Sequence, residues 1–226
     1  MNVLKSAACA ALLACSAALP AQAALIYDSI VPVSGTGHGA TPTILAVQNN
    51  GTETGSVSWN GATDIRTGHA TNQSHTAAIS SLAPVTAADL RVIFTPNEPQ
   101  SAAGRSITLT NLVLSIYSAA GNLLWNSTGA FAQQTFSEHT QEGSAFGYAY
   151  KLDAAQALAA QPFFANGSNR IGLSASLSNA ASGAEAFFAL SLTSPTVPPV
   201  PVPAPAGLAL LGAGLLGLGL VRRKTA

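Results

Sequence analysis

Strict period-two alternation is the feature that most constrains the fold of this chain. From Ile171 to Ser178, apolar residues occupy every odd position and Gly or Ser every even one. Successive side chains of a β-strand point to opposite faces, so this pattern predicts a strand with one buried and one solvated face. Residues 146–150 repeat the pattern with aromatic residues. In 106–118 the alternation changes phase at Thr110-Asn111, which predicts a β-bulge that keeps both halves on one face.

Shorter apolar runs separated by turn residues extend this pattern along the chain. The further predicted strands are 44–47, 57–59, 92–94 and 187–192. Turn-forming residues stand between the strands, at 49–51, 120–122 and 166–169. One short helix is predicted over 154–160, because Asp153 can cap this alanine-rich run and Pro162 ends it. The whole predicts a mainly β fold, an antiparallel β-sandwich of jelly-roll or immunoglobulin-like type with one short helix.

The first 23 residues have the parts of a secretory signal peptide. Lys5 supplies a positive start, 7–19 supplies an apolar segment, and the small residues Ala21 and Ala23 mark a cleavage site. An N-terminal membrane anchor is a poorer interpretation, because the apolar run is short and Pro20 ends it. Lipoprotein processing at Cys15 is a third interpretation, and it would leave the Ala-x-Ala site unused. We expect residues 1–23 to be removed on export.

The exported part contains no cysteine, because Cys9 and Cys15 both lie in the signal peptide. Its stability must therefore come from a hydrophobic core rather than from disulfides. Residues 24–205 carry five basic and nine acidic residues, a formal charge of −4. Nucleic-acid binding needs clustered Lys and Arg, so this composition argues against a nucleic-acid partner. We expect residues 24–194 to form the sandwich ectodomain.

The C-terminal end predicts a membrane anchor. Six prolines in 195–205 favour an extended spacer. Residues 206–221 are uninterruptedly apolar and are followed at once by the basic residues Arg222, Arg223 and Lys224. We therefore predict a C-terminal transmembrane helix within 206–226, its basic end in the cytoplasm and the ectodomain outside. Its 16 apolar residues would span roughly 24 Å, short of the roughly 30 Å hydrocarbon core.

The tail resembles a PEP-CTERM sorting signal. The resemblance rests on Val202, Pro203 and Pro205, on the apolar run and on the basic end, and it covers only about the last 25 residues. The usual Pro-Glu-Pro is here Pro203-Ala204-Pro205. The resemblance implies export by the secretion machinery of a Gram-negative bacterium and recognition of the tail by an exosortase-type membrane enzyme. It also implies association with exopolysaccharide and biofilm at the cell surface or in the extracellular matrix.

Three groups of residues are candidates for chemical sites. Glu138, His139 and Glu142 lie within five residues and could bind a metal or transfer protons. His69 and His75 have Asp64 nearby and could likewise hold a metal. Neither has a metal-site motif, and solvated loops explain both. The glycines of 35–39 lack the spacing and the following helix of a phosphate loop. We therefore predict no catalytic residue, no cofactor and no metal.

The aromatic residues offer a candidate sugar-binding platform. They are Trp59, Tyr117, Trp125, Tyr148 and Tyr150, and packing in the core is the default interpretation for most of them. We predict a non-enzymatic surface or matrix protein. The alternatives are a secreted carbohydrate-binding or carbohydrate-active domain, such as a hydrolase or lyase, and a self-assembling subunit with an exposed sheet edge.

Overall fold

The computed structural model describes residues 25–32, 43–82, 86–97, 106–137, 146–181 and 183–192, all in the unit that runs from Met1 to Leu192. The predicted signal peptide, Pro-rich spacer and membrane anchor lie outside these residues. Within the described ranges, no helix is long and apolar enough to cross a membrane.

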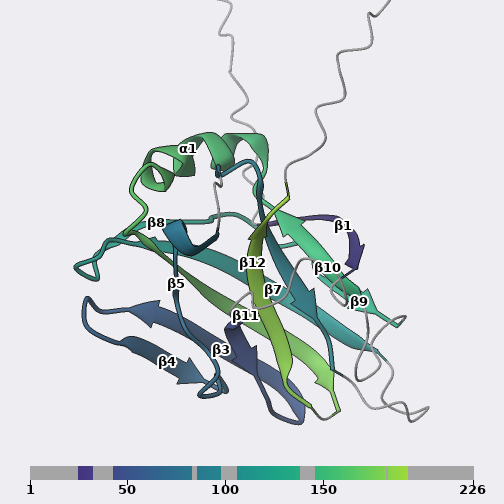
Figure 1. Ribbon diagram of the computed structural model, residues 1–226. Coiled ribbons are helices and arrows are strands. Elements are labelled where there is room, and N and C mark those ends of the chain that lie inside the picture. The colour runs from purple at the N-terminus through teal and green to yellow at the C-terminus, as the bar shows by residue number, and fades with distance from the viewer. Residues whose placement is uncertain are drawn as a thin grey trace, which may run out of the picture. The chain divides into compact units, whose positions relative to one another are not determined.

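Two antiparallel sheets make up most of the described chain (Figure 1). The five-stranded sheet has the order β1 (Ile26–Pro32), β10 (Phe146–Lys151), β6 (Leu90–Thr95), β12 (Glu185–Ser191), β2 (Thr43–Val47). The main path of the second sheet is β4 (Asp64–Gly68), β3 (Gly51–Trp59), β11 (Arg170–Ala180), β7 (Ile107–Tyr117), β8 (Leu123–Asn126). This second, seven-stranded sheet also contains β5 (Ala77–Ala78) beside β11 and β9 (Gln134–Phe136) beside β7. The helices are the 3-10 helix η1 (Ile79–Leu82) and α1 (Ala154–Phe164).

One hydrophobic core lies between the two sheets. Phe94 and Phe187 reach it from the five-stranded sheet, and their ring centroids are 4.9 Å apart. Leu114 and Leu173 reach it from the seven-stranded sheet, and both are almost fully buried. Burial of such side chains is the main favourable term in folding, at about 25 cal/mol per Å² of apolar surface. The prediction of a mainly β, antiparallel sandwich-like fold with one helix is confirmed.

Consecutive strands repeatedly cross from one sheet to the other. β2 and β3 follow each other in the chain but lie in different sheets, as do β6 and β7, and β11 and β12. β2 therefore pairs with β12, the last described strand, and β3 pairs with β11.

The predicted bulge in the longest strand is confirmed. In the pairing of β11 with β7, Ser176 faces Asn111 and Leu177 faces Leu109, so Thr110 is the extra residue. Two apolar residues before the bulge and three after it all point into the core and are fully buried. They are Ile107, Leu109, Leu112, Leu114 and Ile116.

Strand β3 is longer than the alternation predicted. Its inner face carries Glu53 and Gly55 ahead of Val57, so the apolar pattern begins only near its end. Glycine is needed at position 55, because a Cβ there would lie 2.6 Å from Val47 Cγ1 and 2.8 Å from the Ala70 nitrogen. Five further strands were not predicted at all: β1, β4, β5, β8 and β9.

Helix α1 begins as predicted but ends later. The Asp153 carboxylate accepts a hydrogen bond from the Gln156 nitrogen at 2.8 Å, which confirms the cap. The predicted end at Pro162 is wrong, because the helix continues to Phe164. A proline in the last turn removes only one backbone donor, and its would-be acceptor belongs to exposed Leu158, where water can replace it. Burial of Phe164 holds this turn against the core.

The segment 69–75, after β4, closes the edge of β2. The Thr71 nitrogen donates to the Ala46 carbonyl at 2.7 Å, and the His75 nitrogen donates to the Ile44 carbonyl at 3.0 Å. The buried Ser74 hydroxyl bonds both backbone groups of Ala46. These bonds join the two sheets at this edge and position His75 and the residue after it.

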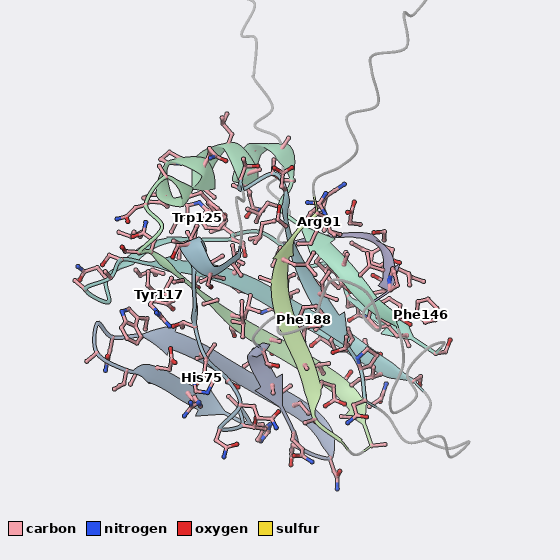
Figure 2. The ribbon with its side chains drawn as sticks, in the orientation of Figure 1. His75, Arg91, Tyr117, Trp125, Phe146 and Phe188 are labelled. Atoms are coloured by element: carbon pink, nitrogen blue, oxygen red, sulfur yellow. The ribbon has the colours of Figure 1, made fainter. Side chains whose placement is uncertain are left out.

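The outer side of the five-stranded sheet is apolar. We call six residues on it the outer apolar cluster: Val31, Ile93, Phe188, Ala149, Leu190 and Leu192. Ile93 and Ala149 are fully buried although they face away from the main core. Figure 2 labels Phe188 of this cluster.

An ionic clamp ties three strands beside this cluster. Asp28 of β1 accepts hydrogen bonds from Arg91 Nε of β6 at 2.7 Å and from Lys151 Nζ of β10 at 2.5 Å. A β-bulge between Tyr27 and Ser29 leaves Asp28 outside the regular pairing. Partial burial acts to raise the pKa of Asp28, but the bonds from Lys151 and Arg91 outweigh it and hold that pKa below its ordinary value. We call these three residues the Asp28 clamp.

Candidate functional site

Most residues singled out for sorting or chemistry lie outside the described residues. They are the signal-peptide residues Ala21 and Ala23, the tail residues Val202, Pro203, Pro205, Arg222, Arg223 and Lys224, the acidic group Glu138, His139 and Glu142, and the glycine loop 35–39. The predictions made for them stay predictions.

The two histidines near Asp64 have separate roles. His69 Nδ1 accepts a hydrogen bond from the Thr54 nitrogen at 3.1 Å. His75 Nδ1 lies 3.1 Å from Asp64 Oδ2, and its side chain is 54% exposed. Across the described part of the chain, no three His, Cys, Asp or Glu side chains are grouped so that they could hold a metal ion.

Asp64 is the acceptor at the centre of a polar network. Its Oδ1 accepts from the Thr76 nitrogen at 3.0 Å and from the Thr76 hydroxyl at 2.5 Å. Partial burial acts to raise the pKa of Asp64, but the bonds from Thr76 and His75, together with the charge of Arg170, lower it below its ordinary value. A carboxylate held ionised in this way is unsuited to donate a proton as a general acid.

Thr76 connects this network to Arg170, the first residue of β11. Arg170 Nε donates to the Thr76 hydroxyl at 2.7 Å, and Arg170 Nη2 donates to the Thr76 carbonyl at 2.6 Å. These two bonds hold the guanidinium in place, and its Cζ lies 4.3 Å from the centre of the Trp59 ring. This is the geometry of a cation–π contact. The network therefore positions an arginine and an aromatic ring together.

The Trp59 ring is held by the packing of two turns. Its Nε1 donates to the Ala119 carbonyl at 2.9 Å. The β3–β4 turn and the β7–β8 turn approach so closely that a Cβ at Gly61 would lie 2.5 Å from the Ala120 carbonyl oxygen, and one at Gly121 would lie 2.1 Å from the Asn60 carbonyl carbon. Both glycines have positive φ, 94° and 89°, which other residues rarely adopt.

Tyr117 completes this end of the sheet. It pairs with Arg170 across β7 and β11, so the two side chains share a face. A Cβ at Gly172 would lie 3.0 Å from the Tyr117 ring and 2.4 Å from the Val57 carbonyl oxygen, so the missing side chain makes room for the ring. We call Trp59, Tyr117 and Arg170 the aromatic corner. Figure 2 shows Tyr117 and His75 on the left of the view, where β3 and β4 lie, away from Arg91 and Phe146 on the right.

Hydroxyl groups occupy most of the other positions on this face. We call the following nine residues the hydroxyl face: Thr52, Thr54, Ser56, Ser58, Thr67, Ser115, Ser174, Ser176 and Ser178. The strand register sets them side by side, because Ser174 pairs with Ser56 and Ser56 pairs with Thr67. All are exposed or half-buried. The positions of β3, β7 and β11 that point to this side contain no ionisable side chain between the corner and the far end.

Neighbouring hydroxyl groups on this face bond one another. The Ser56 and Thr67 hydroxyls are 2.7 Å apart, and the Thr54 hydroxyl donates to the Ser176 hydroxyl at 3.3 Å. A serine or threonine hydroxyl is both donor and acceptor, so each pair keeps capacity for a further bond. The face can therefore offer a neutral array of donors and acceptors to a ligand.

The predicted aromatic platform is only partly assembled. Tyr148 and Tyr150 are 4% and 1% exposed, which confirms the core interpretation for them. Trp125 packs against the core. Trp59 and Tyr117 end β3 and β7 at the same end of the sheet, and Arg170 contacts the first and pairs with the second. Arg170 and the hydroxyl face were not identified as site residues from the sequence. The alternating serines of 172–178 were visible there, but their neighbours on β3 and β4 depend on strand register.

Known proteins offer no further guide to this site. No protein-family model matches the chain, and neither does any curated protein or solved structure.

Proposed function

We propose that the two sheets form a jelly roll rather than an immunoglobulin-like sandwich. The support is strand order once β1, β4, β5 and β9 are set aside as additions. The first of the eight remaining strands then lies beside the last, the third beside the sixth, the second beside the seventh and the fourth beside the fifth. An immunoglobulin sandwich instead keeps its first two strands in one sheet, whereas β2 and β3 lie in different sheets here.

On this scaffold, we propose a non-enzymatic surface or matrix protein that binds a neutral polysaccharide. The chain is exported through its signal peptide, and an exosortase-type membrane enzyme sorts it by its tail. The support for export and sorting is the sequence of the two ends. A jelly roll alone implies no ligand, because one fold carries many functions. Polysaccharide binding is therefore argued from the hydroxyl face and the aromatic corner.

The hydroxyl face carries the ligand proposal. A neutral polysaccharide presents many hydroxyl groups and no charged group, so it is matched by a neutral array of donors and acceptors. The sugar ring also has apolar C–H faces, which pack on aromatic rings, and Trp59 and Tyr117 stand at one end of the array. A polyanion would find only Arg170 on this face of β3, β7 and β11, so we favour a neutral polymer.

A pull-down with neutral polysaccharides tests this proposal. We expect the full-length protein to be retained by a matched polymer and a Ser56→Glu variant to lose retention, because its charge would be desolvated against the ligand. Ala159→Glu places the same charge on the exposed face of α1 and should bind as wild type. Equal retention of both variants, or no retention of the wild type on any neutral polymer, contradicts the proposal.

Intact-mass analysis of the protein from its producing cell tests the sorting proposal. We expect the native mature protein to lack residues 1–23 and part of the tail. With neutral replacements at Arg222, Arg223 and Lys224, the tail should remain uncut or the protein should be found in another location. Unchanged mass and location in that variant would show that the tail is not a sorting signal.

A further inference from the structure

A second, concave site lies at the side of the sandwich, away from the hydroxyl face. A pocket of about 180 Å³ opens between the start of β1 and the segment that leads into β9. β1 is the edge of the five-stranded sheet, and β9 belongs to the seven-stranded sheet, so the pocket sits where the two sheet edges meet. Its lining includes Ile26, Tyr27, Ala130, Ala132, Gln133 and Gln134.

One of the lining residues of this pocket is aromatic. Tyr27 is 40% exposed, and its ring lies edge-on against the buried Tyr150 ring, with centroids 5.8 Å apart. Tyr150 is held in turn by Phe131, at 5.7 Å. The Tyr27 ring is thus braced from within the protein while a large part of its surface remains open to a ligand.

Two neighbouring amides supply the polar groups. Gln133 is exposed, and Gln134 is half-buried. The Tyr150 hydroxyl donates to Gln134 Oε1 at 3.3 Å, and burial raises the pKa of this hydroxyl. This bond orients the Gln134 amide, with Oε1 directed at the Tyr150 hydroxyl. Each amide can both donate and accept, as adjacent hydroxyl groups of a sugar require.

The size and charge of the pocket limit its ligand. Sites for drug-sized molecules usually measure about 300–1,000 Å³, so this smaller pocket suits a single ring. The lining has no Asp, Glu, Lys, Arg or His. A carboxylate, phosphate or ammonium group would therefore be desolvated without a partner in the lining. An aromatic residue, several apolar residues and two amides in one lining together match one neutral pyranose.

We propose that this pocket binds one neutral pyranose ring, with the ring packed on Tyr27 and its hydroxyls bonded by the amides of Gln133 and Gln134. The inference shares its ligand class with the proposed function and depends on it only to that extent. The pocket would bind a single sugar unit, such as a chain end or a branch, whereas the hydroxyl face would bind several consecutive units of a polymer.

Ligand-observed NMR with methyl glycosides tests the pocket directly. The probes are neutral methyl hexosides and 6-deoxyhexosides, with methyl glucuronide as the charged comparison. We expect the full-length protein to bind at least one neutral probe and to bind the glucuronide much more weakly. The variant Gln133→Ala removes an exposed amide without touching the core, and it should weaken binding by about tenfold.

Matched variants separate this proposal from the polysaccharide proposal. Tyr27→Ala should abolish binding of the methyl glycoside and Tyr27→Phe should retain it, whereas Tyr117→Ala should leave it unchanged. Binding of the glycoside that survives both Gln133→Ala and Tyr27→Ala overturns the pocket. If no neutral probe binds while the polymer is still retained, the pocket proposal fails and the proposed function stands. If the polymer is not retained but a probe binds at Tyr27, the hydroxyl face fails and the pocket stands.

Discussion

The two sheets of this protein share one core but differ sharply on their outer sides. The five-stranded sheet carries the outer apolar cluster and the Asp28 clamp, so its outer side is built largely from buried groups. The seven-stranded sheet carries the hydroxyl face, whose side chains are all partly or fully exposed. Buried groups contribute to stability, whereas exposed hydroxyl groups contribute little to it. The difference suggests that one outer side supports the fold and the other is available to a ligand.

The same change to alanine on each outer side gives the largest contrast. Ile93→Ala empties a fully buried site and should lower the free energy of unfolding by about 2–5 kcal/mol. Ser174→Ala removes a half-buried hydroxyl and should change it by less than about 0.5 kcal/mol. Urea unfolding of the two full-length variants measures both values. Similar losses in the two would end the distinction between the outer sides.

Removing the Asp28 carboxylate comes next in size. Asp28→Asn leaves the buried Arg91 without its anionic partner, and we expect a loss of about 1–3 kcal/mol at neutral pH. The introduced amide keeps the shape of the side chain, so a loss of this size would report the charge. Urea unfolding at neutral pH measures it, and an unchanged midpoint would show that the clamp adds no stability.

Acid should lower the stability of the wild type through the two carboxyl groups whose pKa values are lowered, those of Asp28 and Asp64. The folded-state pKa values of Asp28 and Asp64 lie below their ordinary values, so their stabilisation is present above the unfolded pKa of about 3.9. It is lost as the pH falls through the folded-state values. Unfolding curves from neutral to acid pH should therefore fall less steeply for Asp28→Asn than for wild type. If the two proteins lost stability equally as the pH falls, the ionised Asp28 carboxylate would not be a source of stability.

A smaller effect is expected at the aromatic corner. Arg170→Lys keeps the charge but loses the planar fork that bonds Thr76 and lies over Trp59. We expect a loss of about 0.5–1 kcal/mol, with a change in tryptophan fluorescence. If Arg170→Lys lowered the free energy of unfolding as much as Asp28→Asn, the outer side of the seven-stranded sheet would also contribute to stability.

The smallest expected effect is that of salt on polymer binding. The hydroxyl face has no ionisable group on its central strands, so affinity for a neutral polysaccharide should change by less than about twofold as the Debye length shrinks from about 10 Å to 3 Å between 0.1 and 1 M salt. Retention measured across this range checks it. A steep fall with salt would instead indicate an ionic ligand that binds elsewhere.

Local patterns in the sequence predicted the strands whose inner faces are uniformly apolar. The phase change at Thr110-Asn111 even located the bulge in β7, because both halves keep their apolar residues inward. Strand β3 was predicted too short, since Glu53 and Gly55 occupy inner positions that the pattern assigns to apolar residues. One oxygen of its inner Glu53, Oε1, accepts a hydrogen bond from the Asn49 nitrogen at 2.7 Å, a contact that no periodicity indicates.

Site residues were harder to predict because they depend on pairing between distant strands. Thr76 and Arg170 are 94 residues apart in the chain and meet only because β5 pairs with β11. The pocket depends likewise on the start of β1 reaching the segment before β9. A sequence shows that Tyr27, Gln133 and Gln134 are present, but it contains no signal that they line one pocket.

The position of β12 has a mechanical consequence. This last described strand lies in the interior of the five-stranded sheet, paired with β6 on one side and β2 on the other. A pull applied through the residues after Leu192 would act along the axis of β12 and load the hydrogen bonds on both sides in shear, all at once. A strand at a sheet edge would instead peel away one bond at a time. The fold is therefore suited to bear a load applied at the end of β12.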